Sequence, residues 1–210
     1  MLEIIEKLNW RYATKSFDSK AYLAESKLDV LKQAFNLTAT SYGLQPIKLL
    51  VIHNKELQQE LVQYSMNQKQ IVEASHLLVF CIQANIDKEF VIEYFKRVHH
   101  VRNTPESILK PFQDFLIDDF SNKSQKEIEI WATNQAYLAL GNLMTVCAVE
   151  GIDACPMEGF DSKDYDTVLN LKARNLKSVL LLPIGHRAED DKFATFKKVR
   201  KTIEDAVITL

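Results

Sequence analysis

Glycine is scarce in this sequence. Only five of the 210 residues are glycine, whereas average usage of about 7% would give roughly 15. They stand at positions 43, 141, 151, 159 and 185, too far apart for the G-x-G-x-x-G dinucleotide fingerprint or the G-x-x-x-x-G-K-[ST] phosphate loop. Both kinds of glycine-rich phosphate site are therefore excluded. Any phosphate that binds must be held mainly by side chains.

An excess of charge and long apolar runs are also missing. Lys and Arg total 26 against 28 Asp and Glu, a formal net charge of -2, which favours neither a nucleic-acid partner nor a membrane partner. The most apolar window, residues 136–149, is shorter than the about 20 residues that span a bilayer. The N-terminus lacks the basic start and apolar stretch of a signal peptide. These features predict a cytoplasmic protein.

Cysteine, histidine and serine motifs give no support for a metal centre or a covalent nucleophile. Cys81, Cys147 and Cys155 show no C-x-x-C spacing and lie in apolar runs, which is typical of buried, reduced thiols. His99 and His100 are adjacent, so on a helix they point about 100° apart and cannot share one metal. No G-x-S-x-G motif occurs. We therefore expect no metal.

The apolar pattern predicts a single α+β domain over residues 1–210. A short helix begins near Leu2, and further helices are expected at 25–40, 55–65 and 124–150, with strands at 47–52, 77–82 and 178–184. Asn54, Ser124 and Asp161 are each expected to cap a helix, and Gly151 to end the helix at 124–150. Residues 87–122 have helical periodicity and form an excursion from the core, and residues 187–210 form a charged tail. The second half of the helix at 124–150 is apolar on nearly every face. It is either the centre of the monomer core or a helix shared between two subunits.

Three short stretches carry candidate binding groups. Arg11 and Lys15 are four residues apart, so in an extended segment both point to one face. Residues 155–160 combine a proline and a glycine after a short strand, and Lys198 and Arg200 are two residues apart in the tail. Taken one at a time, the stretch at 11–15 is typical of a solvated edge strand, that at 155–160 of a plain turn, and that around Lys198 and Arg200 of a basic tail. Together they favour one anion held by cationic side chains.

Eight landmarks in chain order resemble the FMN-dependent nitroreductase family, specifically its oxygen-insensitive NAD(P)H nitroreductases that are similar to dihydropteridine reductase. They are R-Y-A-T-K-S-F at 11–17, T-S-Y-G-L-Q-P at 40–46, Asn67, E-A-S-H at 73–76, residues 131–142, P-M-E-G-F at 156–160, P-I-G-H at 183–186 and K-V-R at 198–200. The resemblance covers nearly the whole chain. It implies a nitroreductase-like fold with a central, mostly antiparallel sheet flanked by helices. It also implies an intertwined homodimer with two FMN sites in the interface, the tail at 187–210 wrapping the partner and residues 207–209 adding a strand to its sheet.

The resemblance also implies a role for individual residues. Arg11, Lys198 and Arg200 would bind the FMN phosphate, and Lys15 would follow the pyrimidine edge of the flavin. A backbone N–H near Glu158 or Gly159 would point at flavin N5. Thr40, Ser41 and Gly43 would come from the second subunit. The full expected cofactor-binding set is Arg11, Tyr12, Ala13, Lys15, Thr40, Ser41, Gly43, Asn67, Gln70, Pro156, Met157, Glu158, Gly159, Lys198 and Arg200.

Two of these positions depart from the family, and the acceptor contact stays open. Gly43 stands where relatives often have Asn. Gln70 stands where many have Lys, which should lower the flavin reduction potential. Phe112, Phe115 and Phe120, in the helical excursion, are alternative candidates for the aromatic residue that contacts substrate.

The implied activity is a ping-pong cycle in which NADH or NADPH reduces the flavin at N5 and an electron-poor small molecule then oxidises it. Expected acceptors are nitroaromatics, quinones or pterins. The sequence requires no side-chain acid or base; Lys15 and the Glu158 backbone would assist the flavin. Two alternatives are a dihydropteridine or enone reductase on the same fold, and a flavin-binding protein without turnover.

Overall fold

The structure, a computed structural model, describes residues 3–210, and Leu2, at the start of the first expected helix, lies outside them. Four strands form one sheet in the order β1 (Ile47–Ile52), β2 (His76–Gln83), β4 (Leu176–Gly185) and β3 (Asp153–Ala154). Each neighbouring pair is antiparallel. The predicted α+β class and antiparallel sheet are confirmed.

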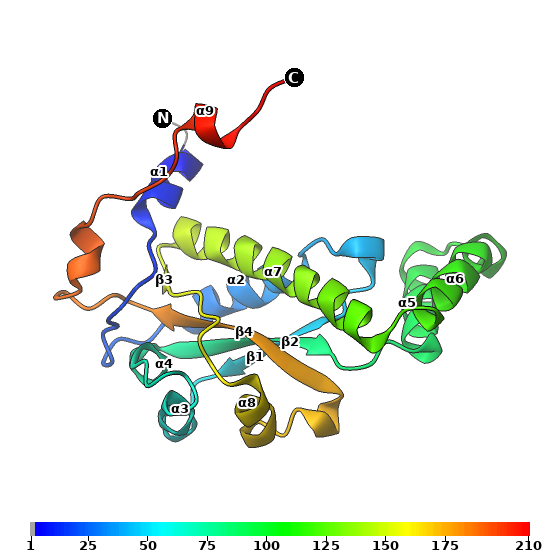
Figure 1. Cartoon of the computed structure of the whole chain (residues 1–210), viewed down its shortest axis with the longest axis horizontal. Helices are drawn as coiled ribbons and strands as arrows, with labels where there is room; N and C mark the ends of the chain where they lie inside the picture. The colour runs from blue at the N-terminus through cyan, green and yellow to red at the C-terminus, as the bar shows by residue number, and fades with distance from the viewer. Residues whose placement is uncertain (1–2) are drawn as a thin grey trace.

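Helices cover both faces of this sheet (Figure 1). One face packs against α2 (Glu25–Asn36) and α7 (Gln125–Glu150), and the other against α3 (Lys55–Val62), α4 (Gln70–Glu73) and α8 (Ser162–Val168). Side chains alternate along β2, so Leu78, Phe80 and Ile82 enter the first core and Leu77, Val79 and Cys81 enter the second. The continuous apolar run in β2 follows from this two-sided burial.

Helix α7 is bounded by the caps that its sequence predicts. Ser124 and Glu127 form a reciprocal capping box, and Gly151 ends the helix in the left-handed region at φ 66°. Its buried stripe includes Ala132, Ala136 and Ala139. The helix is therefore central to the monomer core, while Ile130, Tyr137, Leu138 and Val149 on its other side are exposed.

The expected excursion at 87–122 consists of two helices, α5 (Lys88–Arg102) and α6 (Glu106–Ser121), which we call the α5–α6 hairpin. It projects beyond one end of the sheet (Figure 1). A small separate core joins it to the body through Leu44, Val91, Phe95 and Leu116.

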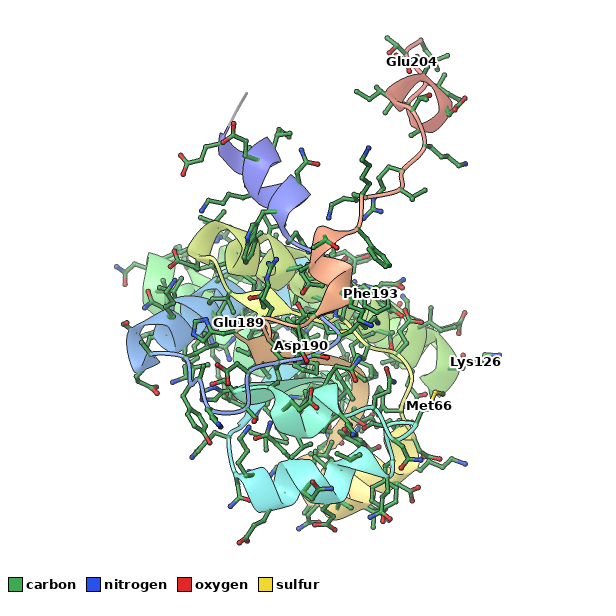
Figure 2. The ribbon with its side chains drawn as sticks, turned by 90° about the vertical axis from the view of Figure 1, so that its left-hand side faces the viewer. Met66, Lys126, Glu189, Asp190, Phe193 and Glu204 are labelled. Atoms are coloured by element: carbon green, nitrogen blue, oxygen red, sulfur yellow. The ribbon has the colours of Figure 1, made fainter. Side chains whose placement is uncertain are left out.

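Helices α1 (Glu3–Trp10) and α9 (Ile203–Ala206) extend from the body at the opposite end of the molecule (Figure 1). Figure 2 shows Glu204 on α9 well away from the sheet. Val199, Ile203 and Ile208 in the tail are all exposed. Residues 207–209 form no strand within the described chain, so the strand exchange stays a prediction.

Local differences from the sequence prediction are small. Helix α3 ends at Val62 instead of residue 65, because the N–H groups of Tyr64 and Ser65 bond to the carbonyls three residues earlier before the chain turns through Met66 and Asn67 at positive φ. Asn54 caps it as expected, accepting from the Leu57 N–H at 2.8 Å. The three cysteines are buried and unbridged, as predicted. Within residues 3–210, no helix is both long and apolar enough to cross a membrane.

Candidate active site

The two ends of the chain meet in a cavity of about 350 Å³, which we call the cation pocket. It is lined by residues from 9–15 and from 193–200. Arg11, Lys15, Lys198 and Arg200, all expected site residues, line it together with Lys197. No acidic side chain in the described chain lines the pocket. The structure thus brings together the cations that the sequence places almost 190 residues apart.

The charges in this pocket repel one another. Burial lowers the pKa of Arg11, and the Arg200 charge lowers it further. Burial, Arg11 and Arg200 likewise lower the pKa of Lys198, whose Nζ donates a hydrogen bond to the Arg11 carbonyl. Among residues 3–210, none of these three cations pairs with a carboxylate. A cluster of like charges without a counter-ion is the electrostatic signature of an anion site.

Asp191 holds the two halves of the pocket together, and sequence reasoning did not single it out. Its buried carboxylate accepts hydrogen bonds from the Lys15 N–H at 2.8 Å, the Ser16 N–H at 3.1 Å and the Tyr12 hydroxyl at 2.9 Å. Burial opposes ionisation, but these bonds outweigh it and lower the pKa of Asp191. The available signal was its place before the short helix at Lys192–Thr195, where it accepts from the Phe193 N–H.

The segment at 11–17 lies beside the loop at 156–159. Ala13 forms a parallel bridge with Ala154 of β3, and the Thr14 N–H donates to the Ala154 carbonyl at 3.3 Å. Two residues further on, the chain enters the proline-containing loop, where Met157 exchanges backbone hydrogen bonds with Leu181. Edge strand β3 thus positions both expected binding segments on one side of the sheet.

Two backbone N–H groups in this loop are available for a ligand. The N–H groups of Met157 and Phe160 donate to Leu181 and Glu158, respectively. Within the described chain, those of Glu158 and Gly159 have no protein acceptor. The Glu158 carboxylate accepts a 2.5 Å hydrogen bond from the Tyr137 hydroxyl on α7, a contact that sequence reasoning missed.

Gly159 allows the turn at 66–68 to approach the same loop. A Cβ atom at this position would lie 3.2 Å from Met66 Sδ and 3.3 Å from Gln68 Nε2. Asn67, at φ 55°, therefore lies in a turn that contacts the 156–159 loop. Gln70 follows three residues later, as the buried first residue of α4.

Thr40, Ser41 and Gly43 lie elsewhere on the chain. The Ser41 N–H donates to Gln135 Oε1 on α7 at 2.8 Å. Arg11 instead lies near Cys147: burial raises the pKa of that thiol to about 12, and the Arg11 charge is close enough to oppose the rise. Positions 135 and 147 are about 18 Å apart along a helix. Within one chain, the turn at Ser41–Gly43 is thus separate from the cation pocket, and its contribution to the site from a second subunit stays a prediction.

Packing within the same chain explains why position 43 is a glycine. It adopts φ 72°, and a Cβ atom there would lie 2.7 Å from the Tyr94 hydroxyl oxygen. Its N–H already donates to the Thr40 carbonyl at 2.9 Å. The close approach that its glycine permits is therefore made by α5 of the same chain.

The three candidate substrate aromatics differ in exposure. Phe112 and Phe115 on α6 are 45% and 54% exposed. Phe120 is 4% exposed and packs edge-on against Trp131, with ring centroids 4.9 Å apart. This burial removes Phe120 from the surface and leaves Phe112 and Phe115 as the candidates.

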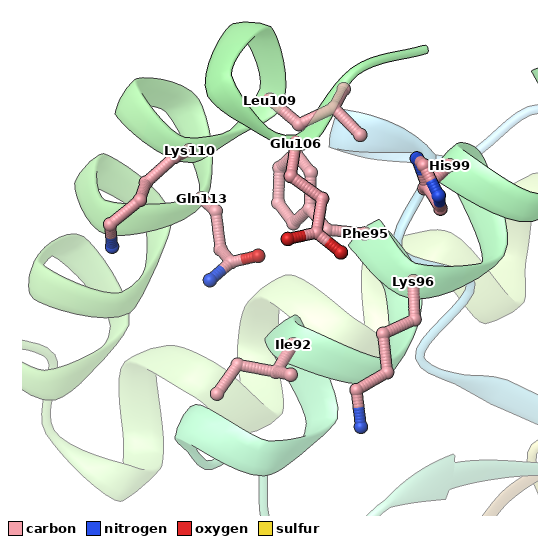
Figure 3. Close-up of a pocket in the computed structure, with 8 residues that line it drawn as sticks. All are labelled: Ile92, Phe95, Lys96, His99, Glu106, Leu109, Lys110 and Gln113. Carbon is pink, nitrogen blue, oxygen red and sulfur yellow. The ribbon is translucent and has the colours of Figure 1, made fainter. Parts of the chain in front are cut away.

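Another cavity, of about 190 Å³, lies between α5 and α6. Figure 3 shows the side chains that line it, which come from these two helices. None of the expected cofactor-binding residues lines this cavity. The cation pocket and the 156–159 loop therefore remain the candidate active site.

Comparison with known proteins agrees with this geometry. Residues 8–186 match the Nitroreductase family. The chain belongs to the nitroreductase family. A relative from Staphylococcus haemolyticus, named "Putative NAD(P)H nitroreductase", is 31% identical, with 97% of this chain and 95% of the relative covered. Family membership makes the chain an oxidoreductase.

Two solved structures share the fold of this nitroreductase-family chain. One, from Exiguobacterium sibiricum and described as a "putative nitroreductase in complex with FMN", has a TM-score of 0.85 at 18% identity, with 100% of this chain and 98% of that chain covered. The other, described as an enone reductase of a gut-bacterial fatty acid saturation metabolism, has a TM-score of 0.81 at 17% identity, with 100% and 99% covered.

Proposed function

We propose that this chain is an FMN-dependent NAD(P)H oxidoreductase that reduces nitroaromatics, quinones or similar electron-poor acceptors by a ping-pong cycle. The observation that carries the proposal is the cation pocket, which has no acid in its lining and opens beside the loop at 156–159. The FMN complex of the Exiguobacterium protein and the name of the Staphylococcus relative support the cofactor and the reductant.

The residues of the site fit FMN. Its phosphate is a dianion near neutral pH, and Arg11, Lys198 and Arg200 supply charge-assisted donors without a competing carboxylate. The flavin ring needs a donor at N5, and the N–H groups of Glu158 and Gly159 have no acceptor in the described chain. The cations for the phosphate and the backbone donors for N5 both lie beside edge strand β3.

The bound flavin supplies hydride chemistry at N5. The protein would contribute position and charge: Arg11, Lys198 and Arg200 would hold the phosphate, and Lys15 would stabilise negative charge on the pyrimidine edge of the ring. The backbone at Glu158 or Gly159 would donate to N5. Gln70 would offer a dipole where the family resemblance implies a cation, so it would stabilise the reduced ring less.

The active form is a homodimer with two FMN sites, each built from both chains. The apolar face of α7 at Ile130, Leu138 and Val149 is exposed in the single chain, as is the apolar end of the tail, and both need a partner surface. Dimerisation would also bring the turn at Ser41–Gly43 of one chain to the flavin of the other. The tail at 207–209 would add a strand to the partner's sheet.

An enone reductase is the second candidate, because the fold of a gut-bacterial enone reductase matches this chain over its whole length. Purified protein tests the main proposal: it should be yellow and release FMN on boiling. It should then oxidise NADH or NADPH with menadione or nitrofurazone as the acceptor. Protein that cannot be reconstituted with FMN contradicts the cofactor assignment. Bound flavin that neither nucleotide reduces contradicts the enzyme assignment.

A further inference from the structure

Tyr42 has an unusual backbone conformation. It lies in the turn Ser41–Gly43 at φ 58° and ψ 0°, the left-handed region that a bulky aromatic residue rarely adopts. Its side chain is still 42% exposed. A residue persists in such a conformation only when its surroundings determine it, so the contacts of this turn identify what it does.

The Tyr42 ring touches aromatic side chains of two helices. Its centroid lies 6.2 Å from that of Phe112 on α6 and 6.4 Å from that of Trp131 on α7. A third contact, at 6.5 Å, is with the buried ring of Phe120. These separations are within the range of favourable aromatic pairs. The ring thus bridges α6 of the hairpin and α7 of the body.

The rest of the turn is held by the same helices. The Ser41 N–H donates to Gln135 of α7, and a Cβ atom on Gly43 would lie 2.7 Å from the Tyr94 hydroxyl oxygen of α5. Leu44 is buried in the small core that joins the hairpin to the body. Four consecutive residues therefore each contact α5, α6, α7 or the core between them.

Beyond this turn, the hairpin is attached through Phe120 of α6, which packs on Trp131 of α7, and through the small core around Val91 and Leu116. It projects from the body (Figure 1), and its two helices, which enclose a cavity between them (Figure 3), contact each other more than they contact other described elements. The turn at 41–44 is thus a main anchor of the hairpin.

We propose that Tyr42 is a positioning residue whose ring fixes the α5–α6 hairpin against the turn at Ser41–Gly43. This inference rests on the proposed function for its catalytic part. The turn at Ser41–Gly43 is expected at the cofactor of the second subunit, and Phe112 is a candidate acceptor contact. Tyr42 belongs to this turn and contacts Phe112. It therefore fixes the distance between the hairpin and the flavin, and so the space that the acceptor ring enters. Its ring, rather than its hydroxyl, carries this role, because none of the described residues bonds the hydroxyl.

The test compares two variants. Tyr42→Asn removes the ring but keeps a residue that tolerates the left-handed region, whereas Tyr42→Phe keeps the ring. Tyr22→Asn is the matched control, because Tyr22 is 57% exposed and contacts Lys55 instead of the hairpin. Hydrogen exchange is measured for peptides from residues 106–121 and from β2, together with kcat/KM for a one-ring quinone and for a bulkier menadione analogue.

In Tyr42→Asn, exchange in residues 106–121 should rise by roughly tenfold with β2 unchanged, and the preference between the two acceptors should shift by about fivefold or more. Tyr42→Phe and Tyr22→Asn should match the native protein. The proposal is overturned if Tyr42→Asn leaves exchange in 106–121 unchanged, if β2 loosens equally, if Tyr42→Phe behaves like Tyr42→Asn, or if acceptor preference does not move. The exchange experiment needs no flavin, so a protein that binds no FMN would refute the proposed function while the hairpin coupling is still decided.

Discussion

Removing the Asp191 carboxylate should loosen both the fold and the cation pocket. This side chain accepts four hydrogen bonds, from Tyr12, Lys15, Ser16 and Phe193, at 2.8–3.1 Å. A hydrogen bond to a charged group contributes about 1.5–3 kcal/mol, and bonds in one network are not additive. Water can accept some of the hydrogen bonds that the Asp191 carboxylate no longer accepts. We therefore expect Asp191→Ala to lower the free energy of unfolding by about 3 kcal/mol.

The same substitution should weaken FMN binding, because Asp191 joins the segment that carries Arg11 and Lys15 to the tail that carries Lys198 and Arg200. With this link broken, the phosphate donors are no longer held together, and we expect a loss of affinity of about tenfold to a hundredfold. Urea denaturation at one fixed protein concentration measures stability, and quenching of FMN fluorescence measures affinity. Asp191→Asn is the control; its amide oxygen still accepts, so its effects should be smaller.

The pH dependence supplies an independent check on this prediction. Because the folded pKa of Asp191 is lowered, the stability that its carboxylate contributes is present above its unfolded pKa of about 3.9 and is lost as pH falls through the folded value. The stability difference between native protein and Asp191→Ala should therefore shrink below about pH 4. Stability within about 0.5 kcal/mol of native for Asp191→Ala at pH 7, with unchanged FMN affinity, would refute the reasoning.

Three further predictions concern the cofactor and the dimer. Arg200→Ala should weaken FMN binding by roughly tenfold, measured by fluorescence titration, whereas Lys201→Ala, outside the pocket, should not; equal effects would move the phosphate elsewhere. Deleting residues 203–210 should raise the dimer dissociation constant measured by sedimentation, and an unchanged dimer would exclude strand exchange. Gln70→Lys should raise the flavin midpoint potential by on the order of 30 mV in a spectroelectrochemical titration; no change would show that position 70 does not act on the flavin, and a fall would contradict the charge argument.

The elements that sequence predicts well are those with local causes. Strand β1 spans the residues expected, and Asn54, Ser124 and Asp161 each cap the helix that follows. Caps and alternating burial depend on neighbours within a few residues, so they can be recognised without knowing the fold. The antiparallel sheet followed from the family resemblance instead, whereas the order of its strands was not predicted and comes from the structure.

The contacts that sequence missed join distant parts of the chain. Asp191 is 176 residues from Lys15 and stands in a run of charge that resembles a solvated tail. Gln135 had a clearer signal, since it is a polar residue within the buried stripe of α7, where it meets Ser41. Phe120 could not be told from Phe112 and Phe115, because all three follow the same helical period and only the packing of Trp131 separates them.

The scarcity of glycine has a thermodynamic consequence in this fold. A glycine-rich phosphate loop is a local structure that exists before its ligand arrives, whereas the cation pocket forms only when residues 9–15 and 193–200 come together. The mutual repulsion of Arg11, Lys198 and Arg200 opposes that closure, and a bound phosphate dianion would remove it. Ligand binding and docking of the tail segment at 193–200 are therefore linked, so each should strengthen the other by the same factor. A chain that held its phosphate on a loop would have no such linkage between its cofactor and its C-terminal segment.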